Sequence, residues 1–86
     1  MTADRVARIR ERLEDAFAPR LLEVVDESHL HVGHAGAREG KGHFRIRIVS
    51  DRFAKAKPLQ RHRMIYDALG EMMETDIHAL SIEVSV

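Results

Sequence analysis

Two runs of alternating side chains constrain the fold of this chain most strongly. In the first run, apolar residues are separated by single arginines in Phe44-Arg-Ile-Arg-Ile48. In the second run, ring-bearing or apolar side chains share one face: His78, Leu80, Ile82 and Val84. In a β-strand, successive side chains point to opposite faces, so residues two apart share a face. Each run therefore predicts a strand that is buried on one face.

Two segments show helical spacing instead. Apolar side chains recur every three or four residues near the N-terminus and predict an amphipathic helix from about Thr2 to Phe17, which Pro19 ends. A second helix is predicted from Pro58, a residue suited to the first helical position, to about Glu74. The expected inner stripe of this helix is Leu59, His62, Ile65, Tyr66, Leu69 and Met73.

The remaining segments complete an α+β order. Leu21–Asp26 predicts a short strand with Leu22 and Val24 on one face, and residues 28–42 predict a long loop. Residues 51–57 are expected to form a turn or a short helical piece. The expected order is α-β-β-α-β, or α-β-β-α-α-β if that piece is helical. We therefore expect one α+β domain over residues 1–86 with a three-stranded mixed sheet.

The connection between the last two strands has a consequence for chemistry. The first two strands should pair antiparallel across the long loop. A crossover through a helix normally makes the last strand parallel to the middle one. Because the starting ends of parallel strands lie together, His78 is expected at the same edge of the sheet as the segment from His29 to His43.

Histidine is abundant in this chain and cysteine is absent. The chain has six histidines and no cysteine, and three of the histidines fall between Ser28 and Gly36: His29, His31 and His34. Imidazole is the commonest metal ligand in proteins and titrates near neutral pH. This segment therefore predicts metal or cluster binding, or pH sensing. The lack of cysteine excludes disulfides, thiolate catalysis and any cysteine-ligated cluster built by this chain alone.

Two further histidines are expected to play other roles. His43 is in phase with the arginines of its strand, so we expect it on the open, solvated face, at a surface available to a partner. His62 lies on the apolar stripe of its helix. We expect it in the core, donating a hydrogen bond to a backbone carbonyl or to the carboxylate of Asp26 or Asp51.

Bulk properties exclude several classes of protein. The formal net charge is zero, which lacks the strong positive field of a dedicated nucleic-acid binder. No apolar run approaches the roughly 20 residues of a membrane span, and the first residues lack a signal-peptide core. We expect a cytoplasmic protein, or one of an organelle matrix. No serine elbow or paired catalytic carboxylates are recognisable, so we expect a non-enzymatic protein without a small-molecule substrate.

Several short segments, in this order and spacing from about residue 20 to the C-terminus, resemble the BolA family. The matching segments are Glu23-Val-Val-Asp-Glu-Ser28, His31-Val-Gly-His-Ala-Gly36, Gly42-His-Phe44, Ile48-Val-Ser-Asp-Arg-Phe53, Arg61-His-Arg-Met-Ile-Tyr66 and Ile77-His-Ala-Leu-Ser-Ile82. The resemblance implies an α-β-β-α-α-β fold similar to the class II KH domain. It also implies a partner, a monothiol (CGFS-type) glutaredoxin.

The same resemblance implies a [2Fe-2S] cluster shared with that glutaredoxin and with glutathione, and none in the isolated chain. Carried over to this sequence, the family's histidine before the last strand is His78. The second ligand comes from the loop between the first strands, where this chain offers His34, with His31 as the alternative. Imidazole replaces thiolate at a cluster iron in Rieske centres, so these residue types suit the chemistry.

Two other functions remain open at this point. In the first, the chain is a DNA-binding transcriptional regulator that uses the KH-like surface, as the family resemblance also implies. The phosphate contacts would then come from Lys41, Arg45, Arg47, Lys55, Lys57, Arg61 and Arg63. In the second, the chain is a protein-interaction module whose histidines sense pH without metal.

Overall fold

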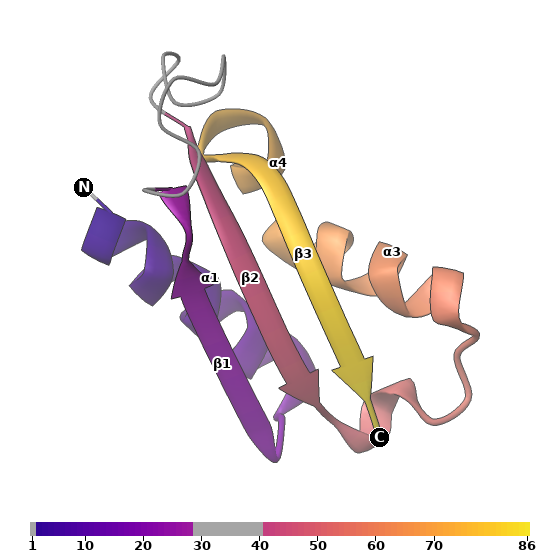
Figure 1. The fold of residues 1–86 in the computed structure, drawn as a ribbon. Coiled ribbons are helices and arrows are strands. Elements are labelled where there is room, and N and C mark those ends of the chain that lie inside the picture. The colour runs from indigo at the N-terminus through magenta and orange to yellow at the C-terminus, as the bar shows by residue number, and fades with distance from the viewer. Residues whose placement is uncertain (1, 29–40) are drawn as a thin grey trace.

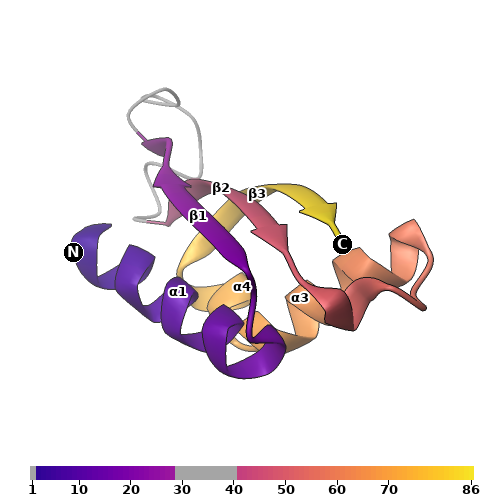
Figure 2. The ribbon, with the colours of Figure 1, turned by 90° about the horizontal axis from the view of Figure 1, so that it is seen from below.

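A three-stranded sheet carries the helices on one face, and none of the helices formed by residues 2–28 and 41–86 covers its other face (Figures 1 and 2). We call this other face the open face. The computed structural model describes residues 2–28 and 41–86. The elements, in chain order, are α1 (Thr2–Phe17), β1 (Leu21–Asp26), β2 (Gly42–Val49), the 3-10 turn η2 (Asp51–Phe53), α3 (Pro58–Leu69), α4 (Met72–Thr75) and β3 (Ile77–Ser85).

The strand order is β1-β2-β3, with β2 in the centre. β1 pairs antiparallel with β2, from Leu21 opposite Val49 to Asp26 opposite Phe44. β3 pairs parallel with β2, and Leu80 lies opposite Phe44. The predicted mixed sheet, its strands and its parallel crossover are therefore confirmed.

The core lies between the sheet and the helices. Alternation along β2 directs Phe44, Ile46 and Ile48 inward and leaves Arg45 and Arg47 exposed, as predicted. The rings of Phe17 and Phe53 pack with their centroids 4.7 Å apart and close the core beside η2. The buried apolar residues are Ile9, Leu13, Phe17, Phe44, Ile46, Ile48, Phe53, Ile65, Leu69, Met72 and Ile77.

One predicted helix is correct and the other ends early. α1 ends at Phe17, as expected from Pro19. α3 ends at Leu69 rather than near Glu74, because Gly70 adopts a positive φ of 56° that stops a right-handed helix. The chain then forms α4 as a separate short helix. Residues 51–57 contribute the short 3-10 turn, so the third helix of the α-β-β-α-α-β order is α4 rather than this segment.

The predicted inner stripe of α3 is partly wrong. Ile65 and Leu69 are fully buried, but Leu59 is 66% exposed and Tyr66 is 40% exposed. The first turn of α3, which contains Leu59, projects past β3 (Figures 1 and 2). The helix is held to the rest of the protein through its second half.

Candidate functional site

The start of β3 contains a β-bulge at His78. Gly42 lies opposite Ile77 and His43 lies opposite Ala79, so His78 has no counterpart in β2. An extra residue in one strand reverses the alternation of side chains on either side of it. Ile77 and Leu80 consequently both face the helices, whereas His78 is exposed. The alternation had predicted His78 on the same face as Leu80, and the bulge is the reason that it is not.

His78 lies beside His43. The centroids of the two imidazole rings are 5.0 Å apart and the ring planes are inclined by 49°. The parallel pairing of β2 and β3 had predicted this meeting of their starting ends, and it is confirmed. The prediction that His43 is solvated is wrong, since its side chain is 5% exposed. The His78 ring beside it comes from a neighbouring strand, and the periodicity of β2 alone cannot reveal such a neighbour.

Backbone hydrogen bonds fix the frame around these rings. The Gly42 N–H donates to the Asp76 carbonyl at 2.9 Å, which joins the starting ends of β2 and β3. The His43 N–H donates to Ser28 Oγ at 3.0 Å, and the Glu27 N–H donates to the His43 carbonyl at 2.7 Å. The three strands are therefore tied together at this end. We call this end, formed by His43, His78 and their backbone, the histidine rim.

An aspartate next to the rim is clamped by the N-terminal helix. Asp76 Oδ1 accepts a hydrogen bond from Arg5 Nε at 3.2 Å, and its Oδ2 lies 3.4 Å from Arg8 Nη1. Partial burial acts to raise the pKa of Asp76, but hydrogen bonds from Thr75 and Arg5 and the nearby arginine charges outweigh it and lower that pKa. Sequence analysis missed this clamp because Arg5 and Asp76 are 71 residues apart and share no local pattern.

The other predicted cluster ligands, His34 and His31, lie outside the described residues, as does His29. Within residues 2–28 and 41–86, no group of three or more histidine, aspartate or glutamate side chains is arranged to hold a metal ion. The candidate ligand that the structure does describe is therefore His78.

The prediction for His62 is wrong. Its side chain is half-buried rather than inside the core. The two aspartates expected to accept its hydrogen bond are engaged elsewhere: Asp26 Oδ1 accepts from the Ser28 N–H at 2.8 Å, and Asp51 lies 3.0 Å from Arg20 Nη2.

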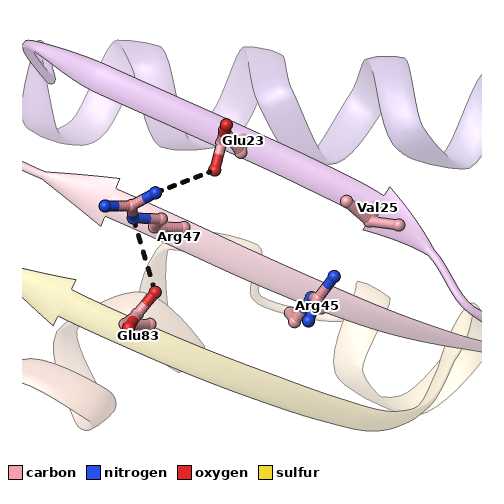
Figure 3. Close-up of a pocket in the computed structure, with 5 residues that line it drawn as sticks. All are labelled: Glu23, Val25, Arg45, Arg47 and Glu83. Atoms are coloured by element: carbon pink, nitrogen blue, oxygen red, sulfur yellow. Dashed lines mark ion pairs between the residues drawn. The ribbon is translucent and has the colours of Figure 1, made fainter.

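Arg45 and Arg47 lie on the open face of the sheet, and both are ion-paired. Arg47 lies between Glu23 at 3.7 Å and Glu83 at 3.4 Å, one on each neighbouring strand (Figure 3). Arg45 Nε lies 3.5 Å from a carboxylate oxygen of Glu27. Carboxylates of Glu23, Glu27 and Glu83 thus lie beside the two arginines that had been predicted to contact phosphates.

The remaining predicted cations gather at the other end of the sheet. Residues 52–63 carry no aspartate or glutamate, and we call their cations the basic corner: Arg52, Lys55, Lys57, Arg61 and Arg63. Arg52, Lys55 and Arg63 line a hollow of about 420 Å³, which Asp67 of α3 also lines. Arg61 is half-buried and donates from Nε to the Ala56 carbonyl at 2.9 Å, which anchors it to the chain before α3. Lys41 lies apart from this group, directly before β2.

Comparison with known proteins identifies the family. The family model described as BolA, BolA-like protein, matches residues 13–86. The chain belongs to the BolA family. A relative in Escherichia coli (strain K12), named DNA-binding transcriptional regulator BolA, is 49% identical over 75 residues, which cover 87% of this chain and 69% of that protein.

Relatives of the BolA family also occur as parts of longer proteins. SufE-like protein 1, chloroplastic/mitochondrial, of Arabidopsis thaliana is 48% identical over 87% of this chain, which spans 22% of that protein. The solved BolA domain of SufE1 from the same plant superposes with a TM-score of 0.83 at 46% identity, covering 94% of this chain and 90% of that one. BolA-like protein 1 of Mus musculus is 44% identical, and the chain spans about half of its length.

Nothing in the described helices resembles a membrane span. Among residues 2–28 and 41–86, no helix is both long enough and apolar enough to cross a bilayer.

Proposed function

We propose that this chain is a non-enzymatic accessory or regulatory protein of iron–sulfur metabolism. In this proposal it binds a monothiol glutaredoxin and supplies imidazole ligands to a [2Fe-2S] cluster shared with that partner and with glutathione. The family membership supports the general role. The partner, the cluster and the ligand residues are what the resemblance to the family implies, and the exposed imidazole of the histidine rim supports them.

The observation that carries the proposal is the exposed imidazole of His78 at the β-bulge. A ligand to a metal held partly by another protein must reach outward from a firm backbone. The bulge directs the ring away from the core, and the hydrogen bond between Gly42 and Asp76 holds the backbone beside it. His43 packs against the ring and limits its orientations.

His78 and a loop histidine, His34 or His31, would hold the cluster iron on this side. Neutral imidazole at iron raises the reduction potential of a [2Fe-2S] centre relative to full thiolate ligation. Two imidazoles also bring no negative charge, so we expect weaker retention than with four thiolates. That property suits transfer or sensing better than permanent storage.

The test mixes the purified chain with a cluster-loaded monothiol glutaredoxin and glutathione, and follows visible absorption and circular dichroism. The native chain should change both spectra, and His78→Ala should abolish the change. Ser81→Ala is the matched control, because it truncates an exposed side chain on the same strand. Binding of each variant to apo-glutaredoxin is measured in parallel, so that loss of a ligand is separated from loss of the complex. If His78→Ala changed both spectra as the native chain does, His78 would be removed from the ligand set.

A second candidate function is duplex DNA binding, and the basic corner favours it. The E. coli relative carries the name of a DNA-binding regulator. Because Arg45 and Arg47 are ion-paired, we assign the phosphate contacts to the basic corner rather than to the whole set predicted from sequence. Lys55, Lys57 and Arg63 are exposed there, and the segment carries no acidic residue.

Salt dependence tests the second candidate. Binding to duplex DNA, measured by fluorescence anisotropy, should weaken with a log–log slope of about −0.9 for each phosphate neutralised. Lys55→Gln should reduce that slope by about one contact. Arg47→Gln should leave the slope unchanged, because Arg47 is already paired with carboxylates. Equal effects of the two substitutions would refute the assignment to the basic corner.

A further inference from the structure

Among the strands formed by residues 2–28 and 41–86, none pairs with the outer side of the β3 backbone. β3 is the last strand of the order β1-β2-β3. The Ser85 carbonyl accepts a hydrogen bond from the Ser50 N–H at 3.1 Å, so the Ser85 backbone faces β2. Peptide groups of successive residues in a strand point to opposite sides. It follows that Ala79, Ser81 and Glu83 also face β2, and that the backbones of Leu80, Ile82 and Val84 face away from it.

This free edge carries few of the features that prevent strands from pairing. Exposed edges are commonly blunted by lysine, proline or a covering side chain. On β1, the Arg10 guanidinium covers the edge by donating to the Leu22 carbonyl at 3.1 Å. β3 contains no lysine, arginine or proline, and Glu83 is its one acidic residue. Among residues 2–28 and 41–86, no group from outside the sheet hydrogen-bonds the backbone of Leu80, Ile82 or Val84.

The apolar side chains of this edge are incompletely covered. Leu80, Ile82 and Val84 face the helices and pack against the core, yet each is only half-buried. By contrast, Ile46 and Ile48 of β2 are fully buried. The helix layer therefore leaves the inner face of β3 partly open. An added strand would bury the remainder of these side chains and satisfy the free peptide groups together.

We propose that β3 pairs antiparallel with β3 of a second copy of this chain, about a two-fold axis at Ile82. Such pairing would form one continuous sheet across both copies. A two-fold axis that pairs the free peptide groups can pass through Leu80, Ile82 or Val84 as a hydrogen-bonded pair, or through Ser81 or Glu83 as a non-hydrogen-bonded pair. Centring at Leu80 or Ser81 would bring His78, in the bulge, opposite Ile82 or Val84. Centring at Glu83 would place two like charges opposite each other, and centring at Val84 would leave the shortest overlap because β3 ends at Ser85.

The register centred on Ile82 is chemically self-complementary. On the helix side, Ile82 meets its own copy and Leu80 meets Val84. On the open side, Ser81 meets Glu83 and Ala79 meets Ser85. No like charges lie opposite one another, and β-branched or apolar side chains face each other, which are favourable cross-strand pairs. The bulge at His78 lies outside the paired segment, so the histidine rim stays accessible.

Ser81 allows a test in which dimerisation and folding respond in opposite directions. Within one molecule, Ser81 lies across from Arg45 of β2. In the proposed dimer it lies across from Glu83 of the second copy. Ser81→Glu should therefore gain attraction to Arg45 but repel the second copy, and Ser81→Lys should do the reverse. Because the native net charge is zero, both variants carry the same magnitude of net charge.

The experiment combines sedimentation equilibrium with thermal unfolding of dilute protein. The native chain should dimerise reversibly. The dimer of Ser81→Lys should have a dissociation constant about tenfold lower than the dimer of Ser81→Glu. As a dilute monomer, Ser81→Glu should melt at the higher temperature of the two. Ser85→Glu, which faces alanine across the axis, is the charge control and should dimerise like the native chain. A native chain that stays monomeric to millimolar concentration would overturn the proposal, even if it bound an extended peptide. Equal dissociation constants for the two Ser81 variants would also overturn it.

Discussion

Gly42 shows how a single residue shapes the histidine rim. A Cβ at this position would lie 2.6 Å from Cε2 of Phe44 and 2.9 Å from Ser28 Oγ. Phe44 is a core residue, and Ser28 accepts the hydrogen bond from the His43 N–H. The absence of a side chain at Gly42 therefore lets the core ring, the β1 end and His43 approach one another.

Gly42→Ala should lower the free energy of unfolding by about 1–3 kcal/mol, as overpacking does elsewhere. Denaturant unfolding monitored by circular dichroism measures the change. Phe44→Leu removes the ring atoms that the new methyl group would meet, so the double variant should be more stable than the sum of the two single effects predicts. Strict additivity would show that the contact with Phe44 is not the cause.

A second residue-scale effect concerns acid stability. Arg12 Nη2 donates to Glu71 Oε1 at 2.7 Å, and its Nη1 donates to the Leu69 carbonyl at 2.6 Å. The hydrogen bond from Arg12, a backbone N–H and the arginine charge hold the pKa of Glu71 below its ordinary value of 4.5. Since the folded protein favours the ionised carboxylate, this contribution is complete above pH 4.5 and is lost as the pH falls through the lowered pKa.

The free energy of unfolding should therefore decrease on acidification below about pH 4.5. Glu71→Gln cannot titrate, so its stability should depend less steeply on pH in that range. Urea unfolding at a series of pH values measures both slopes. Parallel curves for the native chain and the variant would rule out this role for Glu71.

At the scale of elements, α3 shows where periodicity stops being informative. Leu59, Ile65 and Leu69 lie on one helical stripe, but this periodicity does not predict how much of the helix the sheet covers. The last half of α3 packs against the core, whereas its first turn projects past β3. A residue at helical spacing is buried only where another element covers it.

The same substitution at two leucines of α3 measures this difference. Leu69→Ala should cost about 2–5 kcal/mol of stability because it leaves a cavity in the core. Leu59→Ala should change stability by less than about 0.5 kcal/mol, because Leu59 is 66% exposed. Similar costs at the two positions would mean that the first turn of α3 packs elsewhere.

The sheet could be predicted from sequence because side-chain alternation is local and because a helical crossover normally makes the two strands it joins parallel. Phe44, Ile46 and Ile48 predicted the central strand, and parallel pairing predicted the meeting of His78 with His43. The bulge could not be predicted, since one extra residue in β3 is visible only against its partner strand. The contact of His43 with His78 and the clamp on Asp76 join side chains that are distant in sequence, and neither has a local signature.

At the scale of the whole molecule, the two candidate surfaces lie at opposite ends of the sheet. The histidine rim lies where β2 begins, and the basic corner starts at η2, just after β2 ends (Figure 1). A strand of this length separates them by roughly 20 Å. A glutaredoxin at the rim would leave the basic corner accessible, so the cluster and nucleic-acid hypotheses do not compete for one surface.

Nitrogen hyperfine coupling tests the central claim most directly. The chain is labelled with ¹⁵N-histidine, combined with unlabelled cluster-loaded glutaredoxin and glutathione, reduced, and examined by pulsed electron paramagnetic resonance. Ligation through His78 predicts strong ¹⁵N coupling that is diminished in His78→Ala and retained in Ser81→Ala. A reduced cluster in the complex without strong ¹⁵N coupling, or with the full coupling in His78→Ala, would contradict the account.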